Sequence, residues 1–399
     1  MSLTLTHPKG LSPSGRRAPA RFVAQVARDW ALVEEAWTHA LASSAATPFQ
    51  TNAWLRPWFA TLGQTDKSEP RFLTLFDRES GQIAAMVPQI ITRQHGARIA
   101  QFPDAGVSDA NAPILGLKAP SDRAGADDLF SAVKAALSDV DLIDWRKMPG
   151  LVEGRPNPFA QLAAARRCPT DSFAMTFEGS WDDYKASLKK KVRYDVERGW
   201  RVMQGDHGAR FVRVSDPETA NGLLSWIETC QRARIVTRGQ NYTLDDPATT
   251  AFYHELLADG IMSGTSIVTA IMAGDEIVAA TLAQRRGTTV VFVRLAVAGG
   301  DWMKFSPGRV LLYRTMAALH DDGVRTIDFS IGNYAYKRRL GVEPYPLIDL
   351  VKPLTWRGAP FAARAAAIHH LRRYPSLDKG IRRVLGIPYQ AFDVEVDQE

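Results

Sequence analysis

The stretch that decides the fold is residues 288–321, TTVVFVRLAVAGGDWMKFSPGRVLLYRTMAALHD. Its first part, Thr288–Ala298, is rich in β-branched residues and predicts a strand. An irregular segment follows, and Gly308–Asp321 then shows the apolar spacing of an amphipathic helix (Val310, Leu312, Tyr313, Met316 and Leu319). We therefore expect a strand that leads through a loop into a helix at Ser306-Pro307-Gly308.

The flanking sequence extends this pattern in both directions. A hairpin is predicted just before it, because Gly274-Asp275 joins the β-branched runs Ser266–Ala273 and Glu276–Arg285. After it we expect a short strand, one or two helical turns and a further strand (Arg325–Ile331, Asn333–Leu340 and Tyr345–Leu354). The order in this half of the chain is hairpin, strand, loop, helix, strand.

The same order occurs earlier in the chain. The matching segments are two hairpin strands, a third strand, a loop, a helix and a last strand (Arg71–Asp77, Gln82–Thr92, Arg98–Pro103, Asp104–Pro113, Asp127–Leu137 and Asp141–Trp145). Such repetition predicts two copies of one structural unit. Each copy would be an α/β (α+β) domain with a mixed, mostly antiparallel sheet flanked by helices.

Length and composition agree with two globular domains. The chain has 399 residues, of which 45% are hydrophobic and 23% charged, and this excludes a disordered protein. We expect a flexible N-terminal tail (1–20), an N-terminal unit (21–175), a C-terminal unit (176–355) and a basic helical tail (356–399). No apolar run is long enough to span a bilayer. Arg16-Arg17 is not followed by an apolar segment, so we expect no export signal and a cytoplasmic location.

The number of cysteines and the net charge limit which kinds of site and partner the protein could have. Cys168 and Cys230 are too few for a disulfide framework or a four-thiolate metal site, which favours a reducing compartment and no metal. The net charge of +6 favours an anionic partner without specifying which. Motif searches find no GxSxG elbow, no P-loop, no HExxH and no GxGxxG.

Two basic segments leave alternatives open. Ser180–Gln204 predicts one amphipathic helix whose polar face carries many cations (Lys185, Lys189, Lys190, Lys191, Arg193, Arg198 and Arg201). That face is either solvated, as the interspersed acidic residues favour, or a rim that attracts a polyanionic substrate. The tail beyond Trp356 either packs against the body or contacts a membrane surface.

The helix start at Ser306-Pro307-Gly308 is a candidate anion site. Proline is favoured in the first helical turn, glycine lets a ligand approach the backbone, and the exposed N–H groups attract negative charge. Lys304 and Arg309 add positive charge. The site would suit a diphosphate, although most sequences of this kind are ordinary helix starts.

A second candidate is Asp328 in its apolar strand. A buried carboxylate there needs a partner. Tyr334, Tyr336 and Lys337 follow closely and would reach a ligand at the strand end, or an Asp–Lys or Asp–Arg pair simply holds the turn.

Together these segments resemble a known family. SLKKKVRYDVERGWRVM, GDEIVAATLAQRRG, SPGRVLLYRTM and IDFSIGNYAYKRRLG, in this order, are similar to the CelD-like (BioF-type) acetyltransferase domain of the GNAT superfamily, which is related to FemAB-type transferases. The likeness covers about Phe49–Leu354. Ser330 stands where the family commonly has glycine, and Gly332 is expected to serve as the later glycine.

The resemblance implies two tandem GNAT-like domains and acyl transfer from acetyl-CoA or another acyl-CoA to an amine or hydroxyl. Tyr336 would protonate the leaving thiolate, with Tyr334 as second choice, while Asp328 would be the base or orient it, and Lys337 would neutralise an anion. The coenzyme would contact the end of the strand and the helix start (Leu295, Val297, Lys304, Phe305, Ser306, Gly308, Arg309 and Val310). The corresponding N-terminal loop, DAGVSDANAP, carries Asp104 and Asp109 but no cation, so we expect it to line the acceptor site.

Alternatives remain for donor and acceptor. The acceptor would be a polysaccharide, an amino sugar or a lipid-linked precursor. FemAB-type relatives imply aminoacyl-tRNA as another donor, and otherwise nucleic acid is not expected as a partner. A non-catalytic module that binds an anionic polymer or a membrane is the competitor from a different class.

Overall fold

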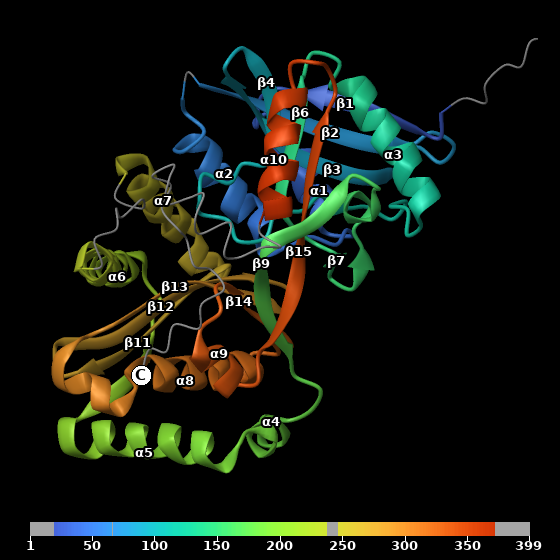
Figure 1. Cartoon of the computed structure of the whole chain (residues 1–399). Coiled ribbons are helices and arrows are strands. Elements are labelled where there is room, and N and C mark those ends of the chain that lie inside the picture. The colour runs from blue at the N-terminus through green and yellow to red at the C-terminus, as the bar shows by residue number, and fades with distance from the viewer. Residues whose placement is uncertain (1–19, 66, 238–245, 372–399) are drawn as a thin grey trace, which may run out of the picture.

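The computed structural model describes residues 20–65, 67–237 and 246–371. The expected N-terminal tail therefore lies almost wholly outside the described residues, as does the part of the basic C-terminal tail after Leu371. In the described part of the chain, one sheet of 13 strands runs through the whole molecule (Figure 1). No helix described here combines the length and apolar composition needed to cross a bilayer.

The sheet consists of two matching halves. The N-terminal half contains β1 to β6 (β1 Phe22–Ala27, β2 Ser68–Asp77, β3 Ile83–Gln94, β4 Ala97–Gln101, β5 Ile114–Leu115 and β6 Leu142–Pro149). The C-terminal half contains β10 to β14 (β10 Ala209–Arg213, β11 Ser266–Ala273, β12 Glu276–Arg286, β13 Thr289–Val297 and β14 Thr326–Ile331). In both halves antiparallel pairs lead to one parallel pair, β4 with β6 and β13 with β14. The predicted duplication and fold class are confirmed.

Each half completes the other. β9 (Ala165–Thr176) follows the N-terminal half in sequence but pairs with β14 of the C-terminal half. β15 (Glu343–Pro353) follows the C-terminal half but pairs with β6 of the N-terminal half. β9 and β15 also pair with each other at the centre of the sheet. The last strands of the two units are thus exchanged, which joins both sheets into one. The minor strands β7 (Leu151–Val152) and β8 (Arg155–Pro156) form a separate pair.

Helices cover both faces and enclose three large apolar clusters, and a small fourth cluster lies around Leu115. Those of the N-terminal half are α1, α2 and α3 (Glu34–Leu41, Asn52–Ala60 and Arg123–Ala136), with the short 3₁₀ turns η1 and η2 (Pro48–Gln50 and Pro158–Gln161). The others are α4 to α10 (Trp181–Ser187, Lys190–His207, Pro217–Thr237, Pro247–Ser263, Pro307–Asp321, Ala335–Arg339 and Ala359–Leu371) and the 3₁₀ turn η4 (Gly300–Phe305).

The largest cluster is shared by both halves. It joins α1 and α2 to α6 and α7, and Trp54 meets Phe252 edge to face with ring centroids 4.9 Å apart. Figure 1 shows α2 beside α7, an arrangement that their contacts support. The other two large clusters lie under α3 and under α5 with α8, one for each half. Burial of aromatic rings between the halves favours a rigid connection between them.

The helix predicted over Ser180–Gln204 is wrong in one respect, because the chain forms two helices there. α4 begins with a capping box at Ser180 and Asp183. The chain then turns extended at Leu188, with φ −70° and ψ 147°, before α5 begins. Leu188 is buried, and the Tyr184 hydroxyl donates to the Leu340 carbonyl at 2.9 Å. Tertiary packing against residues near Leu340 therefore overrides continuous helical periodicity.

Candidate active site

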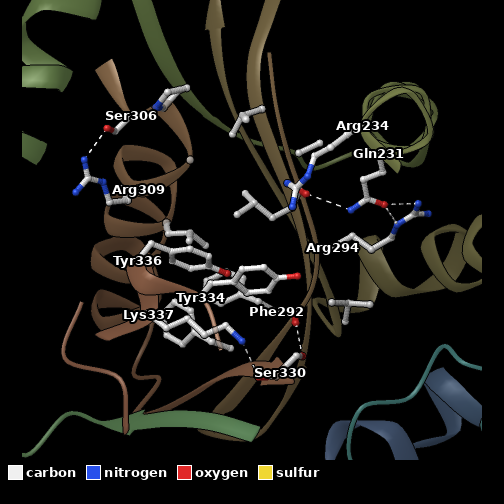
Figure 2. A pocket seen from close by; sticks show the side chains of 18 of the residues that line it. Gln231, Arg234, Phe292, Arg294, Ser306, Arg309, Ser330, Tyr334, Tyr336 and Lys337 are labelled. Carbon is white, nitrogen blue, oxygen red and sulfur yellow. Dashed lines mark hydrogen bonds between the residues drawn. The ribbon is translucent and has the colours of Figure 1, made fainter. Parts of the chain in front are cut away.

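A cavity opens where β13 and β14 separate. The two strands pair in parallel only between Thr289–Val291 and Thr326–Asp328. Beyond Val291 they diverge, and the first turn of α8 lies beside the gap. The resulting cavity has a volume of about 470 Å³, and Figure 2 shows many of its side chains. Among the described residues, no strand pairs with β13 along this edge beyond Val291, which gives a ligand access to the backbone.

The start of α8 forms one wall of the cavity. Pro307 is the first helical residue, and no side chain of the described residues caps the turn. The Val310 N–H bonds the Ser306 carbonyl at 3.2 Å, while Arg309 donates from Nη2 to the Ser306 hydroxyl at 2.6 Å. A Cβ on Gly308 would lie 3.0 Å from Val297 Cγ1, so glycine allows the helix to approach β13. The unused N–H groups of a helix start attract an anion.

The end of β14 turns sharply at Ser330, which adopts φ +62°. Its N–H donates to Asp328 Oδ1 at 2.7 Å and its hydroxyl donates to the Phe292 carbonyl at 2.6 Å. This left-handed conformation favours glycine, the residue that the resembling family commonly has here. Serine preserves the turn and also ties the end of β14 to β13.

Lys337 supports the same turn from beneath. Its side chain is 1% exposed, and Nζ donates to the carbonyls of Ser330 and Ile331 at 2.8 and 2.9 Å. Nζ also lies 4.7 Å from the centre of the Phe173 ring. Burial lowers the pKa of Lys337 to about 7, against the opposing effect of Asp328 and Asp109. Lys337 thus holds the backbone at the floor of the cavity.

Asp328 is fully engaged by hydrogen bonds. Besides the Ser330 N–H, Oδ1 accepts from Ser172 at 3.0 Å and Oδ2 accepts from the Tyr345 hydroxyl at 2.5 Å. Burial raises the pKa of Asp328, while these donors oppose the rise. Its neighbours come from β9 and β15, the exchanged strands, and it is not among the residues that line the cavity. An orienting role suits this geometry better than proton transfer.

Asp109 enters the cavity from the N-terminal half. It lies in the loop between β4 and β5 and lines the cavity together with residues of β13, α8 and α9. Burial is the main cause that raises its pKa to about 6; Asp104 and Asp328 add to the rise, and Lys147 counters it. The nearby Asp104 is held by Lys147 Nζ at 2.7 Å and by Asn111 Nδ2 at 2.9 Å. A partly buried carboxylate with this pKa is suited to general base catalysis near neutral pH.

The sequence analysis did not identify the residues of α6 that complete the wall of the cavity. Arg294 of β13 is 3% exposed and donates to Glu228 at 3.0 Å and to Gln231 at 2.7 Å. Gln231 in turn donates to the Leu295 carbonyl at 3.1 Å, and Arg234 also faces the cavity (Figure 2). The one available signal was Arg294, a single charge in an otherwise apolar strand. Nothing local indicated which helix would pair with it.

The structure brings most predicted site residues to one cavity. Leu295, Val297, Ser306, Gly308, Arg309, Tyr336 and Lys337 line it, and Lys304, Phe305, Val310 and Asp328 are not among its lining residues. Tyr334 and Tyr336 stack with ring centroids 5.9 Å apart. Burial raises the pKa of Tyr336, so the phenol keeps its proton at neutral pH. In the described part of the chain, no cluster of three or more His, Cys, Asp and Glu residues would hold a metal ion.

At its parallel strand pair the N-terminal half has a smaller hollow of about 300 Å³, lined by Gln101, Phe102, Asp144 and Arg146 among others. Asp144 of β6 corresponds to Asp328 of β14. The residue before each of them pairs with the neighbouring parallel strand, Ile143 with Ala100 and Ile327 with Val290. There Arg146 binds both Asp144 and Asp349 of β15, the latter at 3.0 Å. Ion pairs therefore occupy the N-terminal position that corresponds to the floor of the C-terminal cavity.

Comparison with known proteins places this geometry in a family. Residues 190–338 match the model of the acetyltransferase (GNAT) domain. These residues form a GNAT-type acetyltransferase domain. They include α5, β13, the start of α8 and Lys337, and thus nearly all of the cavity. The GNAT-type domain makes this protein an acyltransferase.

Solved structures support the same fold for the longer chain. FemX is similar with a TM-score of 0.56 at 10% identity, over 80% of this chain and 96% of FemX. The C-terminal domain of a putative lysylphosphatidylglycerol synthetase from Agrobacterium fabrum has a TM-score of 0.50 at 13% identity, over 85% of this chain and 97% of that domain. At such identities the likeness concerns the fold, which is a GNAT/FemAB-like one. None of the curated proteins matches this sequence.

Proposed function

We propose that the protein transfers an acyl group from acyl-CoA to an amine or hydroxyl group held in the cavity between β13 and β14. The observation that carries this proposal is the junction of an open strand edge with the uncapped start of α8. The diphosphate of the donor would bind the N–H groups near Gly308 and the Arg309 guanidinium. The acyl group would then lie along β13, near Leu295 and Val297.

The cavity residues supply the remaining chemistry. The acceptor nitrogen or oxygen attacks the thioester carbon, the C–S bond breaks, and the acyl group becomes an amide or ester. Asp109 takes the proton that the acceptor loses, and the Tyr336 phenol donates one to the departing thiolate. Asp328 and Lys337 act indirectly by holding the backbone at Ser330. Amides on the free edge of β13 stabilise the oxyanion.

The two sides of the cavity suggest how the substrates divide it. The α8 side carries positive charge and would take the donor, whereas Asp109 from the N-terminal half faces the acceptor. A cationic or hydroxylated acceptor suits a carboxylate better than an anionic one does. We propose a polysaccharide, an amino sugar or a lipid-linked precursor as the acceptor, and a cytoplasmic site of action.

One observation favours a second donor. α5 exposes a basic face that includes Lys190, Lys191, Arg198 and Arg201, and its middle packs on η4 next to the α8 start. Such a face would attract the phosphates of aminoacyl-tRNA, the donor that the resemblance to FemAB-type transferases implies. Glu197 on the same helix is also exposed and weakens this attraction.

Donor binding tests the proposal directly. Coenzyme A is expected to raise the melting temperature of the full chain, and Arg309→Gln is expected to reduce that shift. Arg198→Gln, which removes the same charge from α5, serves as the control and should leave the CoA shift unchanged. Stabilisation by tRNA, lost in Arg198→Gln and absent with CoA, would instead favour the second donor. No shift with CoA up to about 1 mM would contradict the proposal.

Turnover is measured by release of the free thiol of CoA. The protein is incubated with acetyl-CoA and a panel of amino sugars and polysaccharides, and products are identified by their added acyl mass. Thiol release that depends on both substrates is expected. Release that is unchanged in Tyr336→Phe would remove this residue from the mechanism without affecting the fold assignment.

A further inference from the structure

A second hollow lies far from the cavity, where the start of α10 meets the turn between β3 and β4. Its volume is about 580 Å³, and its lining includes His95, Trp356, Arg357, Pro360, Phe361 and Arg364, here called the Trp356 surface. Trp356 is 80% exposed. None of these residues lines the proposed donor site, so the surface requires a separate explanation.

The backbone beneath the Trp356 surface is firmly held. Asp141, just before β6, accepts the Leu354 N–H at 2.8 Å through its carbonyl and binds the Thr355 hydroxyl through its carboxylate. A Cβ on Gly358 would lie 2.0 Å from the Asp141 carbonyl oxygen, so only glycine permits this contact. The exposure of Trp356 is therefore a property of an ordered segment.

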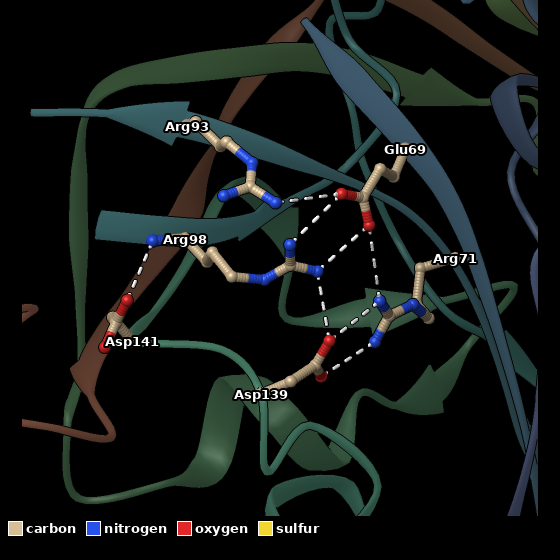
Figure 3. Close-up of polar contacts among 6 residues, drawn as sticks. All are labelled: Glu69, Arg71, Arg93, Arg98, Asp139 and Asp141. Atoms are coloured by element: carbon tan, nitrogen blue, oxygen red, sulfur yellow. Dashed lines mark hydrogen bonds and ion pairs between the residues drawn. The ribbon is translucent and has the colours of Figure 1, made fainter. Parts of the chain in front are cut away.

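An ionic network built around the buried Arg71 extends this support into the sheet (Figure 3). The Arg98 backbone N–H donates to the Asp141 carboxylate at 2.9 Å, and the Arg98 guanidinium donates to Glu69 and Asp139. Arg71, which is 1% exposed, completes the network through a bidentate ion pair with Asp139. The network fixes the β4 end of the hollow, so the surface is presented as a rigid unit.

The chain segment that carries the Trp356 surface has charge of one sign. From Val351 to Leu371 the sequence contains no Asp or Glu but contains Lys352, Arg357 and Arg364. The Arg357 guanidinium lies 5.5 Å from the centre of the Trp356 ring. α10 buries none of its side chains completely, and Ile368 is 36% exposed. This ordered segment therefore combines an exposed tryptophan with arginines and lacks acidic residues, and these residue types are found where proteins contact membrane surfaces.

We propose that the Trp356 surface and α10 dock on an anionic phospholipid bilayer. The tryptophan ring would enter the headgroup region, and Arg357 and Arg364 would bind lipid phosphates. Charge complementarity selects this occupant, because a bilayer rich in anionic lipid offers many phosphates to the arginines that line this hollow. Docking would hold the enzyme beside membrane-bound acceptors, although the inference does not depend on the proposed activity.

Vesicle sedimentation with the full chain tests this inference. Vesicles made of equal parts phosphatidylcholine and phosphatidylglycerol should bind the protein, vesicles of phosphatidylcholine alone should bind it weakly, and added salt should reverse binding. Trp356→Ser, and the double variant Arg357→Gln with Arg364→Gln, should each reduce binding. Each charge near an anionic surface changes affinity about fivefold, so the double variant should lose more than tenfold.

A matched control removes the same charge elsewhere. The pair Lys190→Gln with Lys191→Gln, on α5, should bind vesicles as the unchanged protein does. Equal loss in this control would show unspecific attraction and overturn the proposal, as would full binding by Trp356→Ser. A dimer in light scattering that Trp356→Ser dissociates, with no vesicle binding, would assign the surface to a second copy instead. CoA stabilisation is measured in parallel and reports separately on the proposed function.

Discussion

At the scale of single residues, Ser330 shows how one side chain can replace a glycine without changing the backbone. Its φ of +62° is strained for any residue with a Cβ. The hydroxyl bond to the Phe292 carbonyl offsets part of that strain, because it ties two diverging strands together. The serine is therefore tolerated for a tertiary reason.

Substitution of Ser330 separates strain from hydrogen bonding. Ser330→Gly loses the bond but relieves the strain, whereas Ser330→Ala loses the bond and keeps the strain. We expect the glycine variant to be more stable than the alanine variant by about 1 kcal/mol, measured by urea denaturation. Equal stability of the two variants would show that the turn is unstrained.

The pKa of Asp109 leads to a prediction about pH. A base must be ionised, so kcat/KM should fall as the pH drops through about 6, and Asp109→Asn should lower turnover by about 10²-fold or more. Asp104→Asn is the matched control in the same loop. The Asp104 charge helps to raise the pKa of Asp109, so removing it should move the acidic limb to lower pH and leave turnover intact. An acidic limb that persists in Asp109→Asn would exclude this residue as the base.

At the scale of elements, the position of the α8 start depends on how closely α5 approaches η4. Gly199, which as a glycine weakens the helical pattern in the sequence, lies at the contact. A Cβ there would be 2.7 Å from the Phe305 carbonyl oxygen, closer than a real Cβ approaches such an atom. Glycine in the middle of α5 thus serves packing, and its low helix propensity is the cost.

The same helix provides a matched pair of substitutions. Gly199→Ala should destabilise the protein by about 1–3 kcal/mol, because α5 must shift away from η4. Gly205→Ala, in the last turns of α5, has no atom within 4 Å of the new Cβ and should stabilise by up to about 1 kcal/mol. Both are measured by thermal or urea unfolding. Stabilisation by Gly199→Ala would mean that the contact with η4 is loose.

At the scale of the whole molecule, the exchanged strands make the two units interdependent. β15 supplies Asp349, which accepts from Arg146 at 3.0 Å and from the Lys147 N–H at 3.0 Å in the N-terminal half. The shared cluster around Trp54 and Phe252 joins the halves a second time. Neither half has a complete sheet without the other.

This dependence predicts one unfolding transition. Calorimetry of the full chain should show a single peak whose calorimetric and van't Hoff enthalpies agree. Asp349→Ala should lower the stability by about 1–3 kcal/mol and shift the whole peak, since it breaks a partly buried ion pair. Two resolved peaks, with only one of them shifted by the substitution, would show that the units unfold separately.

The sequence by itself determined the local elements and their repetition. β-Branched runs, the helical spacing after Gly308 and the turn residues depend on neighbours a few positions away, so the hairpins and α8 were predictable. The candidate site was found in part for the same reason: Gly308, Arg309, Tyr336 and Lys337 lie in two short segments around one strand end.

Only the tertiary structure decided how the distant parts meet. The exchange of β9 and β15, the break at Leu188 and the pairing of Arg294 with Glu228 and Gln231 of α6 all depend on contacts between segments far apart in the chain. Strand partners are chosen by burial and register over the whole sheet, and no local propensity records that choice.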